Sequence, residues 1–353
     1  MAKVKKEKQP ESLLTPRENF RLMGHQNEER ALLEAFYSGR LPHAWLFSGQ
    51  KGIGKATLAH RFARFLLTQT AGADSLFNAP ATTLVCGEDT PAVRRILSGS
   101  HGDLLVLEAG EKDISVEEAR SIGKFLRLTA AEAPYRVVII DSIDNMNRNA
   151  ANAILKLLEE PPSHAVLLLI SHNPGKLLPT IRSRCRKLAM EPLAKDDFVR
   201  VLDLLDQGIS VSEAEALYPV ANGSPGIACD IHLHGGLDYY AKILNVLRDF
   251  PTLDIPSIHQ LGDALSGKAA AEDWRIVSFL WHYFLYRLTT QGHIEEIAPG
   301  EAQVLECLRA KSSVANWLDL WEKIRGSLED VERIHLNKKQ VLGNIFQLLA
   351  AGR

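Results

Sequence analysis

Four short runs of apolar residues stand out in the first half of the chain. They span residues 43–48, 104–107, 136–141 and 165–170. Continuous apolar runs of this length are typical of strands that helices cover on both faces of a sheet. The pattern therefore predicts buried strands over 43–48, 136–141 and 165–170, and a fourth strand over 104–107.

The segments between these runs have a different period. Apolar side chains recur at spacings of three and four over residues 28–38 and 57–68, which predicts helices. A third helix is expected over residues 148–160, because Pro161 and Pro162 prevent its continuation. Strands that alternate with helices form parallel sheets, so the pattern predicts an α/β fold for the first domain.

After Met190 the strand pattern stops, and the remaining apolar positions have helical spacing. The string Asn-Gly-Ser-Pro-Gly over residues 222–226 is a strong helix breaker inside this region. We therefore predict four parts: a disordered basic tail over residues 1–18, an α/β domain over 19–190, a small helical domain over 191–235 and an all-helical domain over 236–353.

The last predicted domain is rich in aromatic residues. Trp and Tyr are frequent at protein interfaces, but a helical domain also needs large side chains in its core. We expect most of these residues in the core: Trp274, Phe279, Trp281, Phe284, Tyr286, Trp317 and Trp321.

Composition and charge exclude several classes of protein. The chain has 353 residues, of which 46% are hydrophobic, and this suits a globular protein of two or three domains. A formal net charge of −2 does not suit a surface built mainly to grip phosphate backbones, so any contact with nucleic acid should be local. The longest apolar runs fall far short of the ~20 residues that span a bilayer. We therefore expect a cytoplasmic protein that does not contact a membrane.

The four cysteines, Cys86, Cys185, Cys229 and Cys307, are widely spaced. Thiols of this kind suit a reducing compartment. None of them forms a CxxC pair, so the sequence predicts neither a disulfide framework nor a zinc site.

The most informative string is Gly-Gln-Lys-Gly-Ile-Gly-Lys-Ala-Thr over residues 49–57, which lies between a predicted strand and a predicted helix. Gly49, Gly52 and Gly54 let the backbone curl so that successive N–H groups face a phosphate. Lys55 adds a positive charge for the terminal phosphates. This spacing in this context predicts a nucleotide-binding loop.

Two positions of the predicted site depart from hydrolytic P-loop proteins. Ser or Thr normally follows the lysine and coordinates magnesium, but Ala56 stands there, and Thr57 is turned by about 100° around the helix. Asp141 is placed as a Walker B aspartate, yet the next residue is Ser142, which cannot act as a base at neutral pH. Asp144 is expected to cap the following helix. Lys55 and Asp141 leave ATP binding open, and we expect any ATP that binds to be held weakly or not to be hydrolysed.

Three strings downstream of this loop carry a specific resemblance. They are Asn-Ala-Ile-Leu-Lys-Leu-Leu-Glu-Glu-Pro-Pro over residues 152–162, Leu-Ile-Ser-His-Asn over 169–173 and Ile-Arg-Ser-Arg-Cys over 181–185. Their order and spacing after a P-loop resemble the bacterial clamp-loader family of AAA+ proteins. The resemblance implies an AAA+ P-loop domain with a parallel sheet, a small helical lid domain and an all-α collar domain that holds subunits in a ring.

The resemblance also implies roles for single residues. In that family the arginine of the Ser-Arg-Cys triplet, here Arg184, reaches across a subunit boundary to the ATP of a neighbour and stabilises charge on the transferred phosphate. Ser171 or Asn173 falls near the sensor 1 position, and Gly226 stands where hydrolysing relatives place the sensor 2 arginine. Many relatives carry a four-cysteine zinc module, of which only Cys86 is present, so we expect no zinc.

Ala56, Ser142 and Gly226 all weaken hydrolysis in the chain's own pocket, whereas Arg184 serves an adjacent pocket. This combination resembles a stator subunit of the DNA polymerase III clamp loader, with little or no ATPase activity alone, and not the motor subunit. The implied partners are ATPase subunits of the gamma or tau type, a delta-type subunit and, through the complex, a sliding clamp and primed DNA. Candidates for a direct contact with DNA are Arg120, Lys124, Arg127 and Arg136.

Two other classes of function stay open at this point. An autonomous motor ATPase or helicase would hydrolyse ATP as a purified chain and would depend on Lys55, but Ala56 and Ser142 argue against it. A nucleotide or small-molecule kinase would need an acceptor site and a mobile lid rich in arginine. The sequence contains no obvious lid of that kind.

Overall fold

The computed structural model describes residues 15–69, 81–109, 113–267, 269–290, 295–334 and 336–351. Most of the predicted tail over residues 1–18 lies outside these ranges. The chain divides into two compact units, Met1–Gln207 and Gly208–Arg353. Their boundary falls inside the predicted lid domain, residues 191–235, so the division into three folded domains stays a prediction.

The first unit is built on a parallel sheet of five strands, in the order β2-β3-β4-β1-β5. The strands are β1 (Ala44–Ser48), β2 (Leu104–Glu108), β3 (Arg136–Asp141), β4 (Ala165–Ser171) and β5 (Arg186–Ala189). The α/β fold and the four strands expected from apolar runs are confirmed. The edge strand β5 was not expected, because only Leu188 of its four residues is buried and it forms no apolar run.

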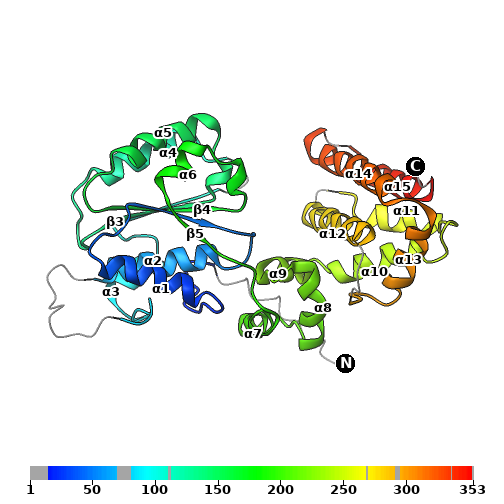
Figure 1. Ribbon diagram of the computed structural model, residues 1–353, viewed down its shortest axis with the longest axis horizontal. Helices are drawn as coiled ribbons and strands as arrows, with labels where there is room; N and C mark the ends of the chain where they lie inside the picture. The colour runs from blue at the N-terminus through cyan, green and yellow to red at the C-terminus, as the bar shows by residue number, and fades with distance from the viewer. Residues whose placement is uncertain are drawn as a thin grey trace, which may run out of the picture. The chain divides into compact units, whose positions relative to one another are not determined.

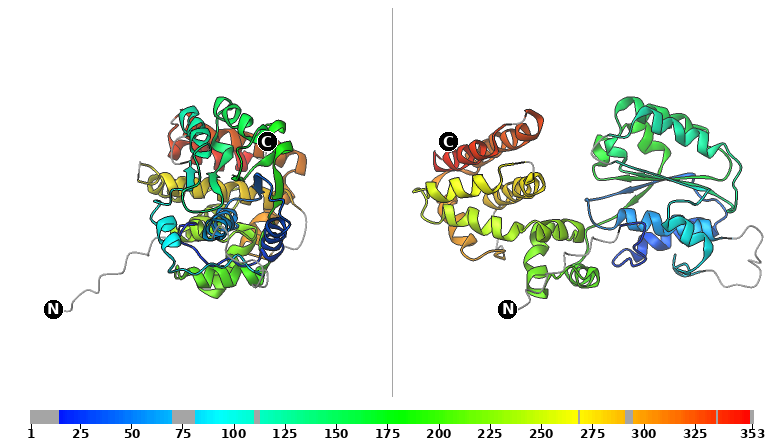
Figure 2. Two further views of the ribbon diagram at one scale, coloured as in Figure 1. Left: turned by 90° about the vertical axis from the view of Figure 1, so that its left-hand side faces the viewer. Right: turned by 180° about the vertical axis from the view of Figure 1, so that it is seen from behind.

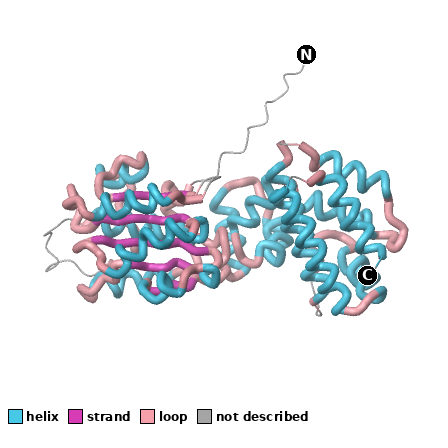
Figure 3. The backbone as a smooth tube through the Cα atoms, turned by 90° about the horizontal axis from the view of Figure 1, so that it is seen from above, coloured by secondary structure: helices cyan, strands magenta, loops and turns pink. Residues whose placement is uncertain are grey.

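Helices cover both faces of this sheet (Figure 1). One face carries α1 (Gln26–Tyr37), α2 (Lys55–Thr68) and α3 (Pro91–Leu97), and the other carries α4 (Val116–Leu126), α5 (Arg148–Glu159) and α6 (Pro179–Arg184). Figure 2 shows the same layers from behind, and Figure 3 shows the strands side by side from above. The unit ends with α7 (Lys195–Leu205).

Each face of the sheet has its own hydrophobic core. On β3, Ile139 belongs to the core with Phe62 of α2, whereas the next residue, Ile140, belongs to the core with Ile154 of α5. Successive side chains of a strand point to opposite faces, so a sheet covered on both sides needs apolar residues at every position. This packing explains why β3 and β4 are continuous apolar runs.

The second unit consists of helices within the described residues. They are α8 (Val211–Ala221), α9 (Pro225–Leu233), α10 (Gly236–Leu247), α11 (Ile255–Ala264), α12 (Ala271–Thr289), α13 (Glu301–Lys311), α14 (Val314–Ile334) and α15 (Lys338–Ala351). Four of the aromatic residues expected in the core are buried there: Trp274, Trp281, Phe284 and Trp317. Tyr286 is exposed. Over the described residues, every helix is too short or too polar to cross a bilayer.

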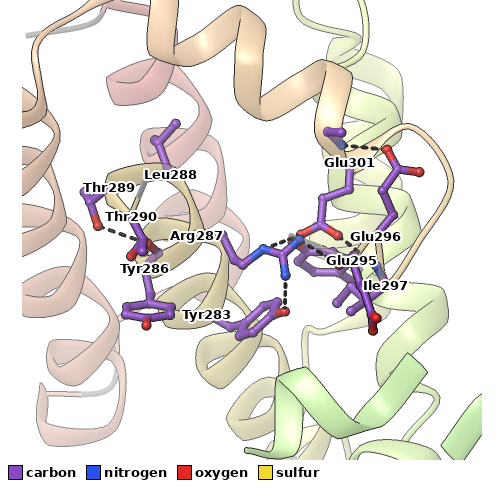
Figure 4. Close-up of polar contacts among 12 residues, drawn as sticks. Tyr283, Tyr286, Arg287, Leu288, Thr289, Thr290, Glu295, Glu296, Ile297 and Glu301 are labelled. Carbon is purple, nitrogen blue, oxygen red and sulfur yellow. Dashed lines mark hydrogen bonds and ion pairs between the residues drawn. The ribbon is translucent and has the colours of Figure 1, made fainter. Parts of the chain in front are cut away.

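A buried polar cluster, formed by Tyr240, Tyr283, Arg287 and Glu301, lies inside this helical unit. Figure 4 shows Tyr283, Arg287 and Glu301 pointing toward one another. Arg287 and Glu301 form an ion pair with 3.3 Å between Nε and Oε1. Arg287 also donates a hydrogen bond to the Tyr283 hydroxyl at 2.9 Å, and Glu301 accepts one from the Tyr240 hydroxyl at 2.7 Å. The backbone N–H of Ile297 donates to the second oxygen of Glu301. The cluster therefore joins α10, α12 and α13.

Candidate nucleotide-binding site

The predicted phosphate loop is a tight backbone turn between β1 and α2. Gly49, Gly52 and Gly54 have φ angles of +149°, +80° and +103°, which favour glycine. At Gly49, a Cβ atom would lie 2.4 Å from the carbonyl oxygen of Met190, so no side chain fits there. The loop leads into the N-terminus of α2, whose free N–H groups and dipole favour an anion. The geometry suits a phosphate group, and nucleotide binding at this loop stays a prediction.

Lys55, the first residue of α2, is buried. Its Nζ donates hydrogen bonds to the carbonyl oxygens of Gly49, at 2.8 Å, and Gln50. Burial lowers the pKa of Lys55 to about 8, and the nearby carboxylates of Asp141 and Asp144 oppose this shift. The amine is therefore mostly protonated at neutral pH, and its positive charge lies within the loop, where it could attract a bound phosphate.

The position after the lysine offers no ligand for magnesium. Ala56 packs against the core between α2 and the sheet, and Thr57 is partly buried one step further around the helix. Across the described residues there is no group of three or more His, Cys, Asp or Glu that could hold a metal ion. At the end of β3, the Asp141 carboxylate can bind magnesium. In the loop, position 56 has no hydroxyl that could do so.

Asp141 is the last residue of β3, so it lies at the carboxyl ends of the strands, as the loop does. Burial and the neighbouring charge of Glu108 raise the pKa of Asp141, and Lys55 opposes the shift. The next residue, Ser142, is buried, and its hydroxyl donates a hydrogen bond to the side-chain oxygen of Asn145. A serine hydroxyl committed in this way cannot take a proton from water. The position that activates water in hydrolytic relatives therefore has no base.

Asp144 differs from expectation. It lies in a single turn, η1 (Ile143–Asn145), and accepts hydrogen bonds from the Ser171 hydroxyl at 2.9 Å and from the backbone N–H of His172. Asn147 caps α5 instead, because η1 ends before that helix begins. The prediction that Asp144 caps the next helix was wrong. Asp144 ties the end of β4 to the end of β3.

The two sensor 1 candidates lie where β4 ends. The hydroxyl of Ser171 is committed to Asp144, whereas Asn173 is exposed. The sensor 2 position, Gly226, lies on α9 in the second unit. Both sensor assignments stay predictions.

Three residues close to the loop were not among the sequence candidates. Nε2 of the buried His25 lies 2.7 Å from the carbonyl oxygen of Ile53 in the loop. Glu108 pairs with Asp141 in the register of β2 and β3. Burial, together with the charge of Lys55, lowers the pKa of His172 to about 4, so this imidazole is neutral at pH 7. Because the three residues come from separate elements, no local pattern joins them to the loop.

Arg184 is the last residue of α6 and lies near the amino ends of the parallel strands, whereas the loop follows the carboxyl end of β1. Its Nη2 lies 2.7 Å from Oε1 of Glu159, and its Nη1 donates a hydrogen bond to the Thr180 carbonyl oxygen at 3.0 Å. About a third of the side chain is exposed (34%). The arginine therefore contacts its own chain but stays accessible from outside.

The structure corrects one of the four DNA-contact candidates. Arg136 is buried at the start of β3, pairs with Asp103 at 3.4 Å between Nη2 and Oδ1, and donates a hydrogen bond to the Thr129 carbonyl oxygen. It is not accessible to DNA, because its side chain is buried and its guanidinium is bound to Asp103 and Thr129 of its own unit. The other candidates, Arg120, Lys124 and Arg127, are exposed at α4.

Cys86 is the single cysteine in the region where the resemblance raised the question of a zinc module. It is partly buried, its sulfur is 3.5 Å from the Thr68 hydroxyl, and burial raises the pKa of its thiol. Residues 70–80, which precede it in this region, lie outside the described residues.

Comparisons with known proteins agree with the fold and the motifs. Residues 24–194 match the family model described as DNA polymerase III, delta subunit. DNA polymerase III subunit delta' of Pseudomonas aeruginosa is 36% identical over 240 residues, which are 67% of this chain and 66% of that protein. Subunit delta' of Bacillus subtilis is 32% identical over 196 residues, 55% of each chain.

A subunit with a different name is also similar. DNA polymerase III subunit tau of Escherichia coli is 31% identical over 206 residues, which are 58% of this chain and 30% of that protein. The matched regions therefore span between about a third and just under two thirds of the length of these three relatives.

Proposed function

Because the chain belongs to the clamp-loader AAA+ family of DNA polymerase III subunits, we propose that it acts as a delta-prime-like stator. In this role it supplies Arg184 in trans to the ATP site of a neighbouring subunit of the gamma or tau type. With a delta-type subunit, the assembly uses ATP to load a sliding clamp onto primed DNA. The chain itself hydrolyses little or no ATP.

The observation that carries this proposal is the separation of Arg184 from the chain's own loop. β5 and β1 are parallel, with Arg186 beside Trp45 and Ala189 beside Ser48. The loop follows the carboxyl end of β1, whereas Arg184 precedes the amino end of β5. A strand rises about 3.3 Å per residue, so the amino and carboxyl ends of these strands are roughly 10 Å apart. An arginine at the amino ends is far from the chain's own loop and suits a phosphate held by another subunit.

The loop itself supports the second half of the proposal. Lys55 and Asp141 are in place, but Ala56 has no hydroxyl for magnesium, and Ser142 has no basic group for water. Positioning of the metal and of the attacking water supplies most of the catalysis of phosphoryl transfer in P-loop enzymes. ATP bound here would therefore persist.

The test is the ATPase rate of a complex reconstituted with gamma- or tau-type and delta-type subunits. Replacing the trans arginine, Arg184→Ala, should lower kcat by roughly 10³-fold or more, because arginine fingers contribute effects of that size. Arg186→Ala is the matched control, since Arg186 is exposed and only two residues away. Gel filtration verifies that both variants assemble. A fully active Arg184→Ala complex would remove the proposed role.

The competing hypothesis, an autonomous motor ATPase or helicase, predicts a different result. The purified chain alone would then hydrolyse ATP with magnesium, and Lys55→Ala would abolish the activity. Under the stator proposal the chain alone shows no turnover above that of Lys55→Ala. An ATP-binding measurement on the unmodified chain and on Lys55→Ala determines whether the loop binds nucleotide at all.

A further inference from the structure

Arg184 forms an ion pair with Glu159 in the chain by itself, with 2.7 Å between Nη2 and Oε1. We propose that Glu159 is a positioning residue, which holds the Arg184 guanidinium in the orientation needed to meet a neighbour's phosphate. The inference rests on the proposed function, because it assigns a role to Glu159 only if Arg184 acts in trans.

Both contacts of the guanidinium are made by ordered parts of the first unit. Glu159 is the last residue of α5, and Thr180, whose carbonyl oxygen accepts from Nη1, lies one turn before Arg184 in α6. Glu160 follows Glu159 and precedes two prolines, which prevent the helix from continuing. The arginine is therefore held between the ends of two helices.

The two contacts leave donors for a phosphate. A guanidinium has five N–H groups in a rigid plane, and the contacts with Glu159 and Thr180 engage at most two of them. The remaining three can bind phosphate oxygens while the carboxylate stays in place. Glu159 and a phosphate are therefore compatible partners of the same side chain.

The ion pair is too exposed to contribute much to the stability of the fold, so its effect is on the orientation of the Arg184 side chain. The side chains of Arg184 and Glu159 are 34% and 49% exposed, and exposed ion pairs contribute little to folding. An unpaired arginine at a surface samples many rotamers, and ordering it when a ligand arrives costs affinity and rate. A carboxylate that restricts those rotamers in advance removes part of this cost.

The test uses the reconstituted complex with Glu159→Gln, which keeps the shape of the side chain and removes its charge. We expect kcat to fall roughly tenfold, because misplacement of a catalytic group by about 1 Å has effects of this order or larger. KM for ATP should stay unchanged, since the neighbouring subunit binds the nucleotide. Glu160→Gln is the matched control, because Glu160 carries the same charge and forms no ion pair with a described residue.

A double-mutant cycle separates positioning from a general structural effect. In the Arg184→Ala background, Glu159→Gln should have no further effect on kcat, because the side chain that it positions is gone. A loss that is the same in both backgrounds would overturn the inference, as would an unchanged or raised kcat of Glu159→Gln alone. A raised rate would mean that the carboxylate competes with the phosphate. Failure of the proposed function is distinct, since Arg184→Ala itself would then be fully active.

Discussion

The two units each contain an ion pair between arginine and glutamate, and the pairs differ in their surroundings. In the first unit, Arg184 and Glu159 form a pair at the surface, at 2.7 Å. In the second unit, Arg287 and Glu301 form a pair at 3.3 Å whose side chains are 5% and 0% exposed. The ion pair with the shorter N–O distance is therefore the one that is partly exposed to solvent.

This difference teaches what each pair can do. Two charges removed from water need further hydrogen-bond partners. Arg287 donates to the Tyr283 hydroxyl and the Glu295 carbonyl oxygen (Figure 4), and Glu301 accepts from the Tyr240 hydroxyl and the Ile297 N–H. Loss of one partner would leave an uncompensated charge. The exposed pair can open at little cost, since water takes over its hydrogen bonds. An arginine that binds another subunit's ligand has to be of the exposed kind.

The largest effect is expected from breaking the buried pair. Arg287→Ala leaves Glu301 buried without its cation, so the free energy of unfolding of the second unit should fall by about 3–5 kcal/mol. Urea unfolding followed by tryptophan fluorescence measures this, because Trp274, Trp281 and Trp317 lie in the core of that unit.

The matched control for Arg287→Ala is Arg325→Ala in the same unit. Arg325 forms exposed pairs with Glu322 and Glu329 on α14, and its loss should change the free energy of unfolding by less than about 0.5 kcal/mol. Equal effects of the two substitutions would contradict the contrast between buried and exposed pairs.

The second effect in size comes from a buried histidine, His60, on which the neighbouring charges of Arg64 and Arg17 act unfavourably. Burial, with smaller contributions from Arg64 and Arg17, lowers the pKa of His60 on α2 to about 3. In the unfolded chain the pKa is about 6.5, so below that pH the unfolded chain binds a proton that the folded unit does not. The stabilisation is complete above pH 6.5 and is lost as the pH falls toward 3. Between pH 7 and pH 5, His60 should by itself remove about 2 kcal/mol of the unfolding free energy of the first unit.

Hydrogen exchange measured at both pH values reads the two units separately and can test this. His60→Leu should remove only part of the pH-dependent loss in the first unit, because the pKa of His172 in the same unit is also lowered, to about 4. His164→Asn is the control, since His164 is exposed and its replacement should leave the whole loss in place. An undiminished loss in His60→Leu would contradict the contribution of His60.

Local patterns were enough to predict most of the fold. β1 to β4 were recognisable because each needs apolar residues on both faces, and the loop was recognisable because positive φ angles demand glycine at fixed spacings. β5 escaped because it contains Arg186 and Lys187 and buries a single residue, Leu188, so it forms no apolar run. The other edge strand, β2, was recognisable because its first four residues are Leu and Val, which pack partly buried against both cores.

The candidate site was only partly predictable for a related reason. The roles of Asp144 and Arg136 depend on partners in other elements, Ser171 at the end of β4 and Asp103 before β2. The partner of Arg184, Glu159, belongs to a different helix. No spacing along the chain encodes such pairs, because they exist only after the sheet and its helices have packed.

The smallest effect on folding is expected at the exposed pair, and it tests the comparison most directly. Glu159→Gln and Arg184→Ala should each change the free energy of unfolding of the first unit by less than about 1 kcal/mol, because water replaces the lost contact. High salt should remove even this difference, since it screens exposed charges. Urea unfolding with hydrogen exchange as the readout measures both values. A loss of about 3 kcal/mol would mean that the pair holds α5 and α6 together, and would contradict the contrast between exposed and buried pairs.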